Sequence, residues 1–199
     1  MVKVSYEQKP FRKAIMQTFD ANVTPSPSNT TEAGRAILAH DPTTGGSLGC
    51  AISEAVEVAT THEATAMYSA PCSIRCCCTS PSSVWRASRL WKCSMSIRIF
   101  VIGCAGGGSN LGGLISPFMQ DKLLGKADPR IIAVEPASCP SLTRGKYVYD
   151  FCDTGHVTPL ARMYTLGNGF VPAPNHAGGL RYHGMSPILS KLYHDGIWR

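Results

Sequence analysis

The sequence has no long apolar run and few charged residues. No stretch approaches the eighteen or so apolar residues that a membrane span needs, and the N-terminus lacks the apolar core of a signal peptide. Only 16% of the 199 residues are charged, whereas 44% are hydrophobic. Disordered chains have the opposite balance. The composition excludes a membrane protein, a collagen and a coiled coil, and it favours a soluble, cytoplasmic α/β protein.

Residues 64–99 contain no Asp or Glu and differ in composition from the rest of the chain. They hold five of the nine cysteines, two of the three tryptophans and five basic residues of a chain whose net charge is +6. Because the remainder is nearly neutral, the net charge does not indicate a nucleic-acid partner. The cysteines do not form paired Cys-x-x-Cys motifs, which argues against a zinc or disulfide module.

We interpret residues 64–99 as an out-of-frame segment bracketed by two compensating frame errors. With a suitable choice of codons for residues 74–85, reading one nucleotide earlier yields an apolar peptide that contains Leu-Leu-His-Gln and Val-Ile-Gly. The alternatives are a metal or disulfide module and a basic nucleic-acid-binding arm. An uninterrupted gene sequence that encodes the residues as printed would exclude the frame hypothesis.

The first sixty residues predict three helices and two short strands. The strand candidates are residues 2–6 and 21–23, and the helices are expected near residues 11–16, 32–38 and 48–56. Pro10 suits the first turn of the first helix, Thr30 or Thr31 is expected to cap the second, and Ser47 opens the third. The second and third helices have amphipathic patterns that predict covers for a sheet.

A glycine loop lies between two short apolar runs in the second half of the chain. Residues 99–102 and 131–134 predict parallel strands buried on both faces, and residues 111–124 predict the helix between them. The loop consists of Gly106, Gly107, Gly108, Ser109 and Asn110. Backbone N–H groups, a hydroxyl and a helix N-terminus together favour a bound phosphate. The loop is not a Walker A motif, it fits G-x-G-x-x-G only up to Leu111, and a simple strand-to-helix turn is the alternative.

This loop resembles the phosphate loop of the tryptophan synthase beta chain, specifically the second lineage of that family. Further matching stretches occur in family order at residues 4–10, 46–55, 134–136, 139–145 and 176–184. The resemblance implies an α/β, three-layer αβα architecture of fold-type-II pyridoxal-phosphate enzymes, incomplete, with parts of two lobes. Residues 1–63 would belong to the N-terminal mobile lobe, residues 64–99 would be poorly ordered, and residues 100–199 would form the phosphate-binding lobe, truncated at its C-terminus.

The same resemblance implies a lyase that converts L-serine and indole to L-tryptophan and water with pyridoxal 5'-phosphate. The cofactor phosphate would lie on residues 106–110, and His176, Arg181 and His183 would belong to a mobile substrate region. The family's Ser-His-Lys motif with its Schiff-base lysine has no match here. We therefore assign no catalytic residue and no metal, and expect this chain not to catalyse the reaction.

Intact relatives are expected to be homodimers, and the resemblance leaves open whether an alpha chain binds. We expect no nucleic-acid partner. The alternatives to this interpretation are another fold-type-II enzyme, such as a threonine or cysteine synthase, and a pseudogene product without a stable fold. The stretch 176–184 argues against the first, because it matches the tryptophan synthase line.

Each candidate side chain outside the glycine loop also has a purely structural interpretation. His176, Arg181 and His183 are equally compatible with solvated loop residues. Glu135, at the end of a predicted strand, either contacts the cofactor or caps a turn, and we favour the turn. We expect Cys50, Cys104 and Cys139 to be small buried hydrophobic residues.

Overall fold

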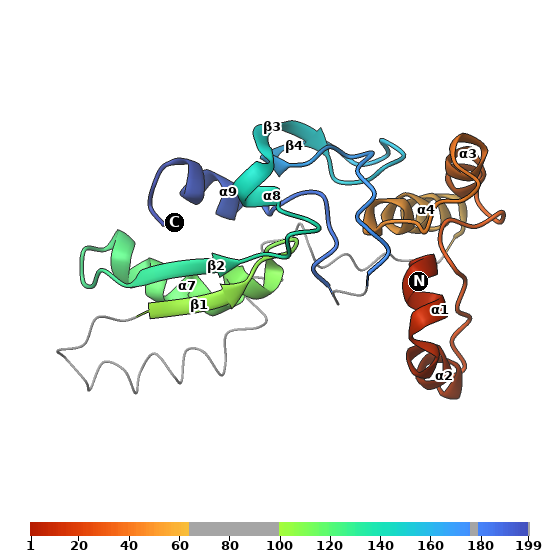
Figure 1. The fold of residues 1–199 in the computed structure, drawn as a ribbon, viewed down its shortest axis with the longest axis horizontal. Coiled ribbons are helices and arrows are strands. Elements are labelled where there is room, and N and C mark those ends of the chain that lie inside the picture. The colour runs from red at the N-terminus through yellow and green to blue at the C-terminus, as the bar shows by residue number, and fades with distance from the viewer. Residues whose placement is uncertain (64–99, 176–178, 199) are drawn as a thin grey trace.

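The computed structural model describes residues 1–63, 100–175 and 179–198. The molecule is elongated, with four helices at one end and a small parallel sheet at the other (Figure 1). A two-stranded hairpin and the C-terminal helix lie beside the parallel sheet. Mixed helices and strands agree with the predicted α/β class, although both described sheets are small.

The helical end confirms the three helices expected from the sequence. α2 (Pro10–Thr18) carries Pro10 in its first turn, α3 (Glu32–His40) begins after Thr31, and α4 (Leu48–Thr61) begins after Ser47. The hydroxyl of Thr31 accepts a hydrogen bond from the N–H of Gly34 at 3.0 Å. The hydroxyl of Ser47 does the same for the N–H of Cys50 at 3.2 Å. Both caps satisfy backbone donors that a helix end leaves unpaired.

The two strands predicted near the N-terminus are wrong. Residues 3–8 form α1 (Lys3–Gln8), and residues 21–23 have no regular structure. Val2 makes one isolated bridge to Ser26, so the pairing ends where a strand would have to continue. Val4 is buried, and its N–H donates to the carbonyl of Gly45. One buried side chain in a short alternating pattern fits a single helical turn as well as a strand.

Helices α3 and α4 pack against each other, and the expectation that they cover a sheet is wrong for the described part of the chain. Two carboxylates of α4 explain this pairing. Glu57 accepts from the backbone N–H groups of Glu32 and Ala33, at the first turn of α3. Glu54, which is buried, accepts from the N–H and hydroxyl of Ser28 and from the hydroxyl of Thr31. Hydrogen bonds to backbone donors at its N-terminus thus hold α3 on α4.

The other end of the molecule contains the predicted strand–helix–strand unit. β1 (Phe100–Cys104) pairs in parallel with β2 (Arg130–Val134), and α7 (Ser109–Leu123) connects them. Val101 and Ile131 lie in one buried cluster with Leu111, Ile115 and Met119 of α7. Gly103 allows this close packing, because a Cβ there would lie 2.7 Å from the side chain of Leu114.

The strands are not buried on both faces, contrary to expectation. Phe100 and Ile102 of β1 are 50% and 60% exposed, while Val101 between them is buried. The described sheet has only two strands, and α7 packs on one face. Cys104, at the end of β1, is also exposed, which corrects the expectation of a buried thiol; Cys50 and Cys139 are buried as expected.

The remaining elements bridge the two ends. β3 (Lys146–Phe151) and β4 (Leu160–Thr165) form an antiparallel hairpin, preceded by the short α8 (Ser141–Arg144). α9 (Pro187–His194) packs on β4 and contributes Leu189 to the same buried cluster as α7. None of the helices in the described ranges has both the length and the apolar character required to cross a bilayer.

Candidate functional site

The glycine loop lies where the sequence predicts it, after the C-terminal end of β1, and its last two residues are the first two of α7. Gly108 has φ = +98°, in the left-handed region that residues with a side chain rarely adopt. Ser109 begins the helix and is partly buried, whereas Asn110 is exposed. Ligands of open α/β sheets bind at this end of the strands.

Residues 179–186 lie directly against the loop, and glycine is needed for this contact. A Cβ on Gly106 would lie 2.7 Å from the carbonyl oxygen of Gly179. A Cβ on Gly108 would lie 2.8 Å from both Met185 Sδ and Ser186 Cβ. The carbonyl of Gly107 accepts a hydrogen bond from the N–H of Ser186 at 3.0 Å. The structure thus brings together two stretches that the sequence analysis identified separately.

Three consecutive N–H groups of the loop are available to a ligand. Within the described residues, those of Gly106, Gly107 and Gly108 donate to no protein acceptor. The fifteen-residue helix α7 directs the positive end of its dipole toward them, and its first turn contains no acidic residue. Unpaired amides at a helix N-terminus are suited to an anion such as a phosphate.

His183 is buried and does not point into the loop. Its Nε2 donates to the carbonyl of Phe151 at 2.9 Å, which places the imidazole proton on Nε2. Burial lowers the pKa of His183, opposed by the bond to Phe151 and by the charges of Asp150 and Asp153. The backbone of the same residue accepts from the N–H of Leu166. Through these two hydrogen bonds His183 connects residues 179–186 to the hairpin segments at Phe151 and Leu166.

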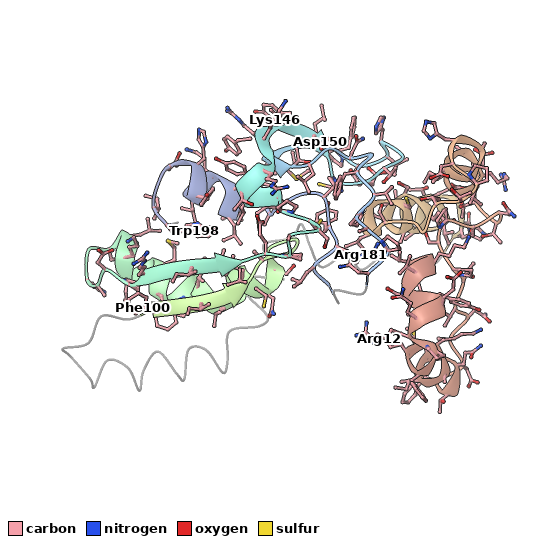
Figure 2. All side chains as sticks on the ribbon, viewed as in Figure 1. Arg12, Phe100, Lys146, Asp150, Arg181 and Trp198 are labelled. Carbon is pink, nitrogen blue, oxygen red and sulfur yellow. The ribbon has the colours of Figure 1, made fainter. Side chains whose placement is uncertain are left out.

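Arg181 is also buried, with 8% of its surface exposed. Its Nη2 donates to the carbonyls of Pro172 and Ala173, while its Nε has no hydrogen-bond partner. Burial lowers its pKa, and the Cys139 thiol acts in the opposite direction. Figure 2 shows Arg181 in the middle of the molecule, close to α1, and it lines a cavity of about 540 Å³ together with Lys3. Arg181 and His183 are thus not solvated loop residues.

The other candidates have structural roles or fall outside the description. Glu135 accepts from the N–H groups of Leu142 and Thr143 at 2.9 Å each, which confirms the preferred interpretation of a capping residue. Cys139 donates to the carbonyl of Tyr182, and burial, aided by the charge of Glu135, raises its pKa to about 11. This thiol stays protonated at neutral pH and is no nucleophile. His176 and residues 64–99 lie outside the described residues.

Sequence reasoning missed the buried carboxylate of Asp153. It accepts from the hydroxyl of Ser53 at 2.7 Å, from the hydroxyl and N–H of Thr158, and from the N–H of Val157. Burial by itself would raise the pKa of Asp153, but these hydrogen bonds outweigh it and the pKa is lowered. The group joins α4 to the hairpin. Ser53 lies on the buried face of α4 beside Gly49 and Glu54, so no apolar pattern in the sequence signals this pairing.

Curated relatives share this sequence at high identity. The chain is 50% identical over 198 residues to a tryptophan synthase beta chain 2 of Methanothermobacter thermautotrophicus. It is 48% identical to a tryptophan synthase beta chain 2 of Thermotoga maritima and to a tryptophan synthase beta chain of Pseudothermotoga lettingae. Each alignment covers 99% of the chain. This chain is a homologue of tryptophan synthase beta chains.

The homology confirms the resemblance inferred from the motifs and defines its extent. The chain spans about half the length of the beta chains it matches, 46% in each of these three. The aligned stretches also run across residues 64–99, which the motif matches did not include. No protein-family model matches the chain.

Proposed function

We propose that this chain carries the phosphate-binding part of a pyridoxal 5'-phosphate site of the tryptophan synthase beta type. The main support is the glycine loop, with three N–H groups that have no acceptor among the described residues. The phosphate would accept from the amides of Gly106, Gly107 and Gly108 and lie beside Ser109 and Asn110. A second support is the homology to proteins named tryptophan synthase beta chain.

The proposed reaction of the whole beta chain joins L-serine to indole, giving L-tryptophan and water. The cofactor, when bound, supplies an electron sink for the serine carbon skeleton. The residues of this chain orient the phosphate end and exclude water, because residues 179–186 close over the loop through the bond from Ser186 to Gly107. We propose no nucleophile from this chain and expect it not to complete the reaction by itself.

Arg181 and His183 are proposed as positioning residues of the substrate region. Their side chains bond to backbone carbonyls of Pro172, Ala173 and Phe151, so they fix the path of the stretch that covers the loop. The Nε of Arg181 is buried without a hydrogen-bond partner, so we propose no contact between it and the substrate. We also propose that the whole beta chain forms a homodimer. The relatives' names favour tryptophan synthase over a threonine or cysteine synthase.

Binding of pyridoxamine 5'-phosphate tests the cofactor site. This probe lacks the aldehyde that reacts with surface lysines, and calorimetry measures its binding directly. We expect pyridoxamine 5'-phosphate to bind and inorganic phosphate to compete with it, whereas unphosphorylated pyridoxamine does not bind. Ser109→Asp should weaken binding at least tenfold, because it places a negative charge at the loop.

Ser116→Asp, two turns further along α7, is the matched control and should leave the affinity unchanged. Equal affinity for the phosphorylated and unphosphorylated probes would contradict the proposal. Unaltered binding by the Ser109→Asp variant would do the same.

The frame hypothesis for residues 64–99 also remains a proposal. Its support is the composition of this window, which has no acidic residue and five of the nine cysteines. Resequencing the gene decides the matter, because an unbroken frame that encodes the printed residues rejects the hypothesis.

A further inference from the structure

Asp153 is a buried charge that does not belong to the glycine loop. Its side chain has no exposed surface, and no cation of the described residues forms an ion pair with it. Burial alone would raise its pKa, but the hydrogen bonds from Thr158, Ser53 and Val157 lower the pKa overall, so the group is charged at neutral pH. A buried carboxylate destabilises a fold unless its hydrogen bonds compensate for the lost water. These hydrogen bonds therefore need a structural reason.

The hydroxyl of Thr158 connects Asp153 to the peptide group between Phe151 and Cys152. This hydroxyl donates to Asp153 Oδ1 at 2.6 Å and accepts from the N–H of Cys152 at 3.0 Å. The carbonyl of the same peptide group, that of Phe151, accepts from Nε2 of His183 at 2.9 Å. Because a peptide group is planar, fixing the direction of its N–H also fixes the direction of its carbonyl. Asp153 thus orients the acceptor that His183 uses.

The next carbonyl along the chain holds a second side chain of residues 179–186, the cover of the glycine loop. The carbonyl of Cys152 accepts from the hydroxyl of Tyr182 at 2.6 Å. Tyr182 and His183 are 2% and 3% exposed, so both side chains make these hydrogen bonds away from water. A buried donor that loses its acceptor costs about 1–3 kcal/mol. Two consecutive carbonyls directly before Asp153 therefore hold two consecutive side chains of the cover.

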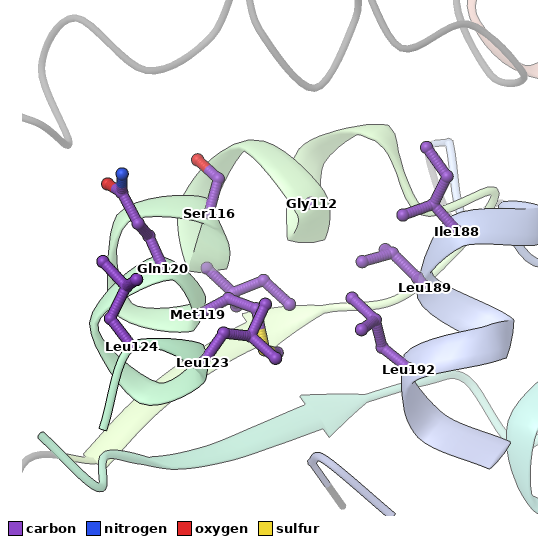
Figure 3. A pocket seen from close by; sticks show the side chains of 10 residues that line it. Gly112, Ser116, Met119, Gln120, Leu123, Leu124, Ile188, Leu189 and Leu192 are labelled. Atoms are coloured by element: carbon purple, nitrogen blue, oxygen red, sulfur yellow. The ribbon is translucent and has the colours of Figure 1, made fainter. Parts of the chain in front are cut away.

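Apolar packing holds the other end of the cover. Residues 179–186 lead into α9, which lines an apolar groove of about 420 Å³ together with α7. Figure 3 shows the side chain of Met119 on α7 directed toward Leu189 on α9, and both are buried. The C-terminal end of the cover is thus fixed by α7, whereas its N-terminal end depends on hydrogen bonds to carbonyl groups.

We propose that Asp153 is a positioning residue of the cofactor site. Through Thr158 it orients the carbonyls that hold Tyr182 and His183, and it thereby keeps the cover against the glycine loop. Asp153 itself makes no hydrogen bond to the loop or to the cover within the described part of the chain. The effect on ligand binding rests on the proposed phosphate site, whereas the effect on the cover is measurable without a ligand.

Asp153→Asn and Thr158→Val test this proposal. The first removes the charge and places an amide donor where the carboxylate accepts, and the second removes the connecting hydroxyl. We expect each variant to bind pyridoxamine 5'-phosphate at least fivefold more weakly in calorimetry. Without ligand, the amides of Leu166, Met185 and Ser186 should exchange hydrogen at least tenfold faster relative to those of α7, because their hydrogen bonds join the cover to the hairpin and to the loop.

Glu54→Gln is the matched control. Glu54 is also a buried carboxylate, but its donors are Ser28 and Thr31, which lie before α3 and not in the hairpin. We expect this variant to lose stability in urea denaturation, as Asp153→Asn does, because each leaves buried donors without acceptors. It should nevertheless retain the wild-type affinity for the probe and the wild-type relative exchange of the cover amides.

The proposal is overturned if Asp153→Asn and Thr158→Val leave the relative exchange of the cover amides unchanged. It is also overturned if Glu54→Gln weakens binding of the probe as much as they do, or if the cover amides exchange faster while the affinity stays the same. Failure of the wild-type chain to bind pyridoxamine 5'-phosphate would instead contradict the proposed cofactor site, and the exchange rates would still report whether Asp153 holds the cover.

Discussion

Buried polar residues connect segments that are far apart in the sequence. Asp153 joins the hairpin to Ser53 of α4, and His183 joins residues 179–186 to Phe151. Each has almost no exposed surface, so each depends on its hydrogen bonds to offset the loss of water. His183 thereby fixes the stretch that lies against the glycine loop, whereas Asp153 links the hairpin to the helical end of the molecule.

Protonation of His183 is expected to destabilise the fold in mild acid. Its pKa is lowered in the folded state, mainly by burial, so below about pH 6.5 the unfolded chain binds a proton that the folded chain does not. The free energy of unfolding should therefore fall as the pH decreases below about 6.5, by at most about 1.4 kcal/mol per pH unit. Urea unfolding at a series of pH values measures this slope.

His183→Gln should reduce that slope while lowering stability at pH 7, because the titrating group is removed. His62→Gln, at an exposed position, is the control and should keep the wild-type slope. A slope that the His183→Gln substitution leaves unchanged would show that another group is responsible. The lowered pKa of Asp153 acts in the same direction but only below about pH 4.

At the scale of elements, the glycine loop depends on two neighbours, one that follows it directly in the sequence and one that lies about seventy residues further on. The first is α7, whose N-terminus supplies the electrostatic potential, and the second is the stretch 179–186, which restricts the space above the loop. The backbone of the loop must turn sharply from β1 into α7, and it must also leave room for the backbone of residues 179–186. Both needs are met by glycine at positions 106 and 108.

Two alanine substitutions separate the backbone requirement from the packing requirement. Gly108 and Gly125 both have positive φ, but only Gly108 has neighbours within 4 Å of an added Cβ. Gly125→Ala should lower the free energy of unfolding by about 1 kcal/mol, because a residue with a Cβ is strained in the left-handed conformation. Gly108→Ala should cost about 3 kcal/mol, since the methyl group also meets Met185 and Ser186.

Thermal or urea denaturation of the two variants provides the measurement. The Gly108→Ala variant should also lose affinity for pyridoxamine 5'-phosphate, whereas Gly125→Ala should retain it. Equal destabilisation by both substitutions would mean that residues 179–186 do not press on the loop.

On the scale of the whole molecule, the sheet formed by β1 and β2 is covered by described residues on one face only. One face of β1 packs on α7, and Phe100 and Ile102 on the other face are exposed. The net charge of +6 keeps copies apart at low ionic strength, because like charges repel. Salt screens this repulsion, so self-association should increase with salt concentration.

Ile102→Lys should reduce this self-association and the binding of the dye ANS. The substitution should change the free energy of unfolding by less than about 0.5 kcal/mol, since it lies at an exposed position. Val101→Lys, one residue away but buried, should instead cost several kcal/mol. Light scattering measures self-association, and urea denaturation measures the free energy of unfolding. Equal destabilisation by Ile102→Lys and Val101→Lys would show that the face of β1 that carries Ile102 is covered.

Local features were readable from the sequence because they depend on neighbouring residues. Thr31 and Ser47 each cap an N–H group three positions further on, and Glu135 binds N–H groups seven and eight positions further on. The strand–glycine–helix unit is likewise continuous in the sequence. The homology to tryptophan synthase beta chains was also readable, since short motifs in family order carry it. The misassigned strand at residues 2–6 shows the limit, because a pattern of five residues fits a helix and a strand equally well.

Tertiary structure alone decided which side chains face one another. Arg181 and His183 were expected in a substrate region, but both are buried and bond to carbonyls 8 to 32 positions away. The exposed face of β1 and the groove between α7 and α9 likewise follow from the packing of elements that are distant in sequence. Amphipathic patterns show that a face is apolar, but the partner that covers it is determined only when the whole chain packs.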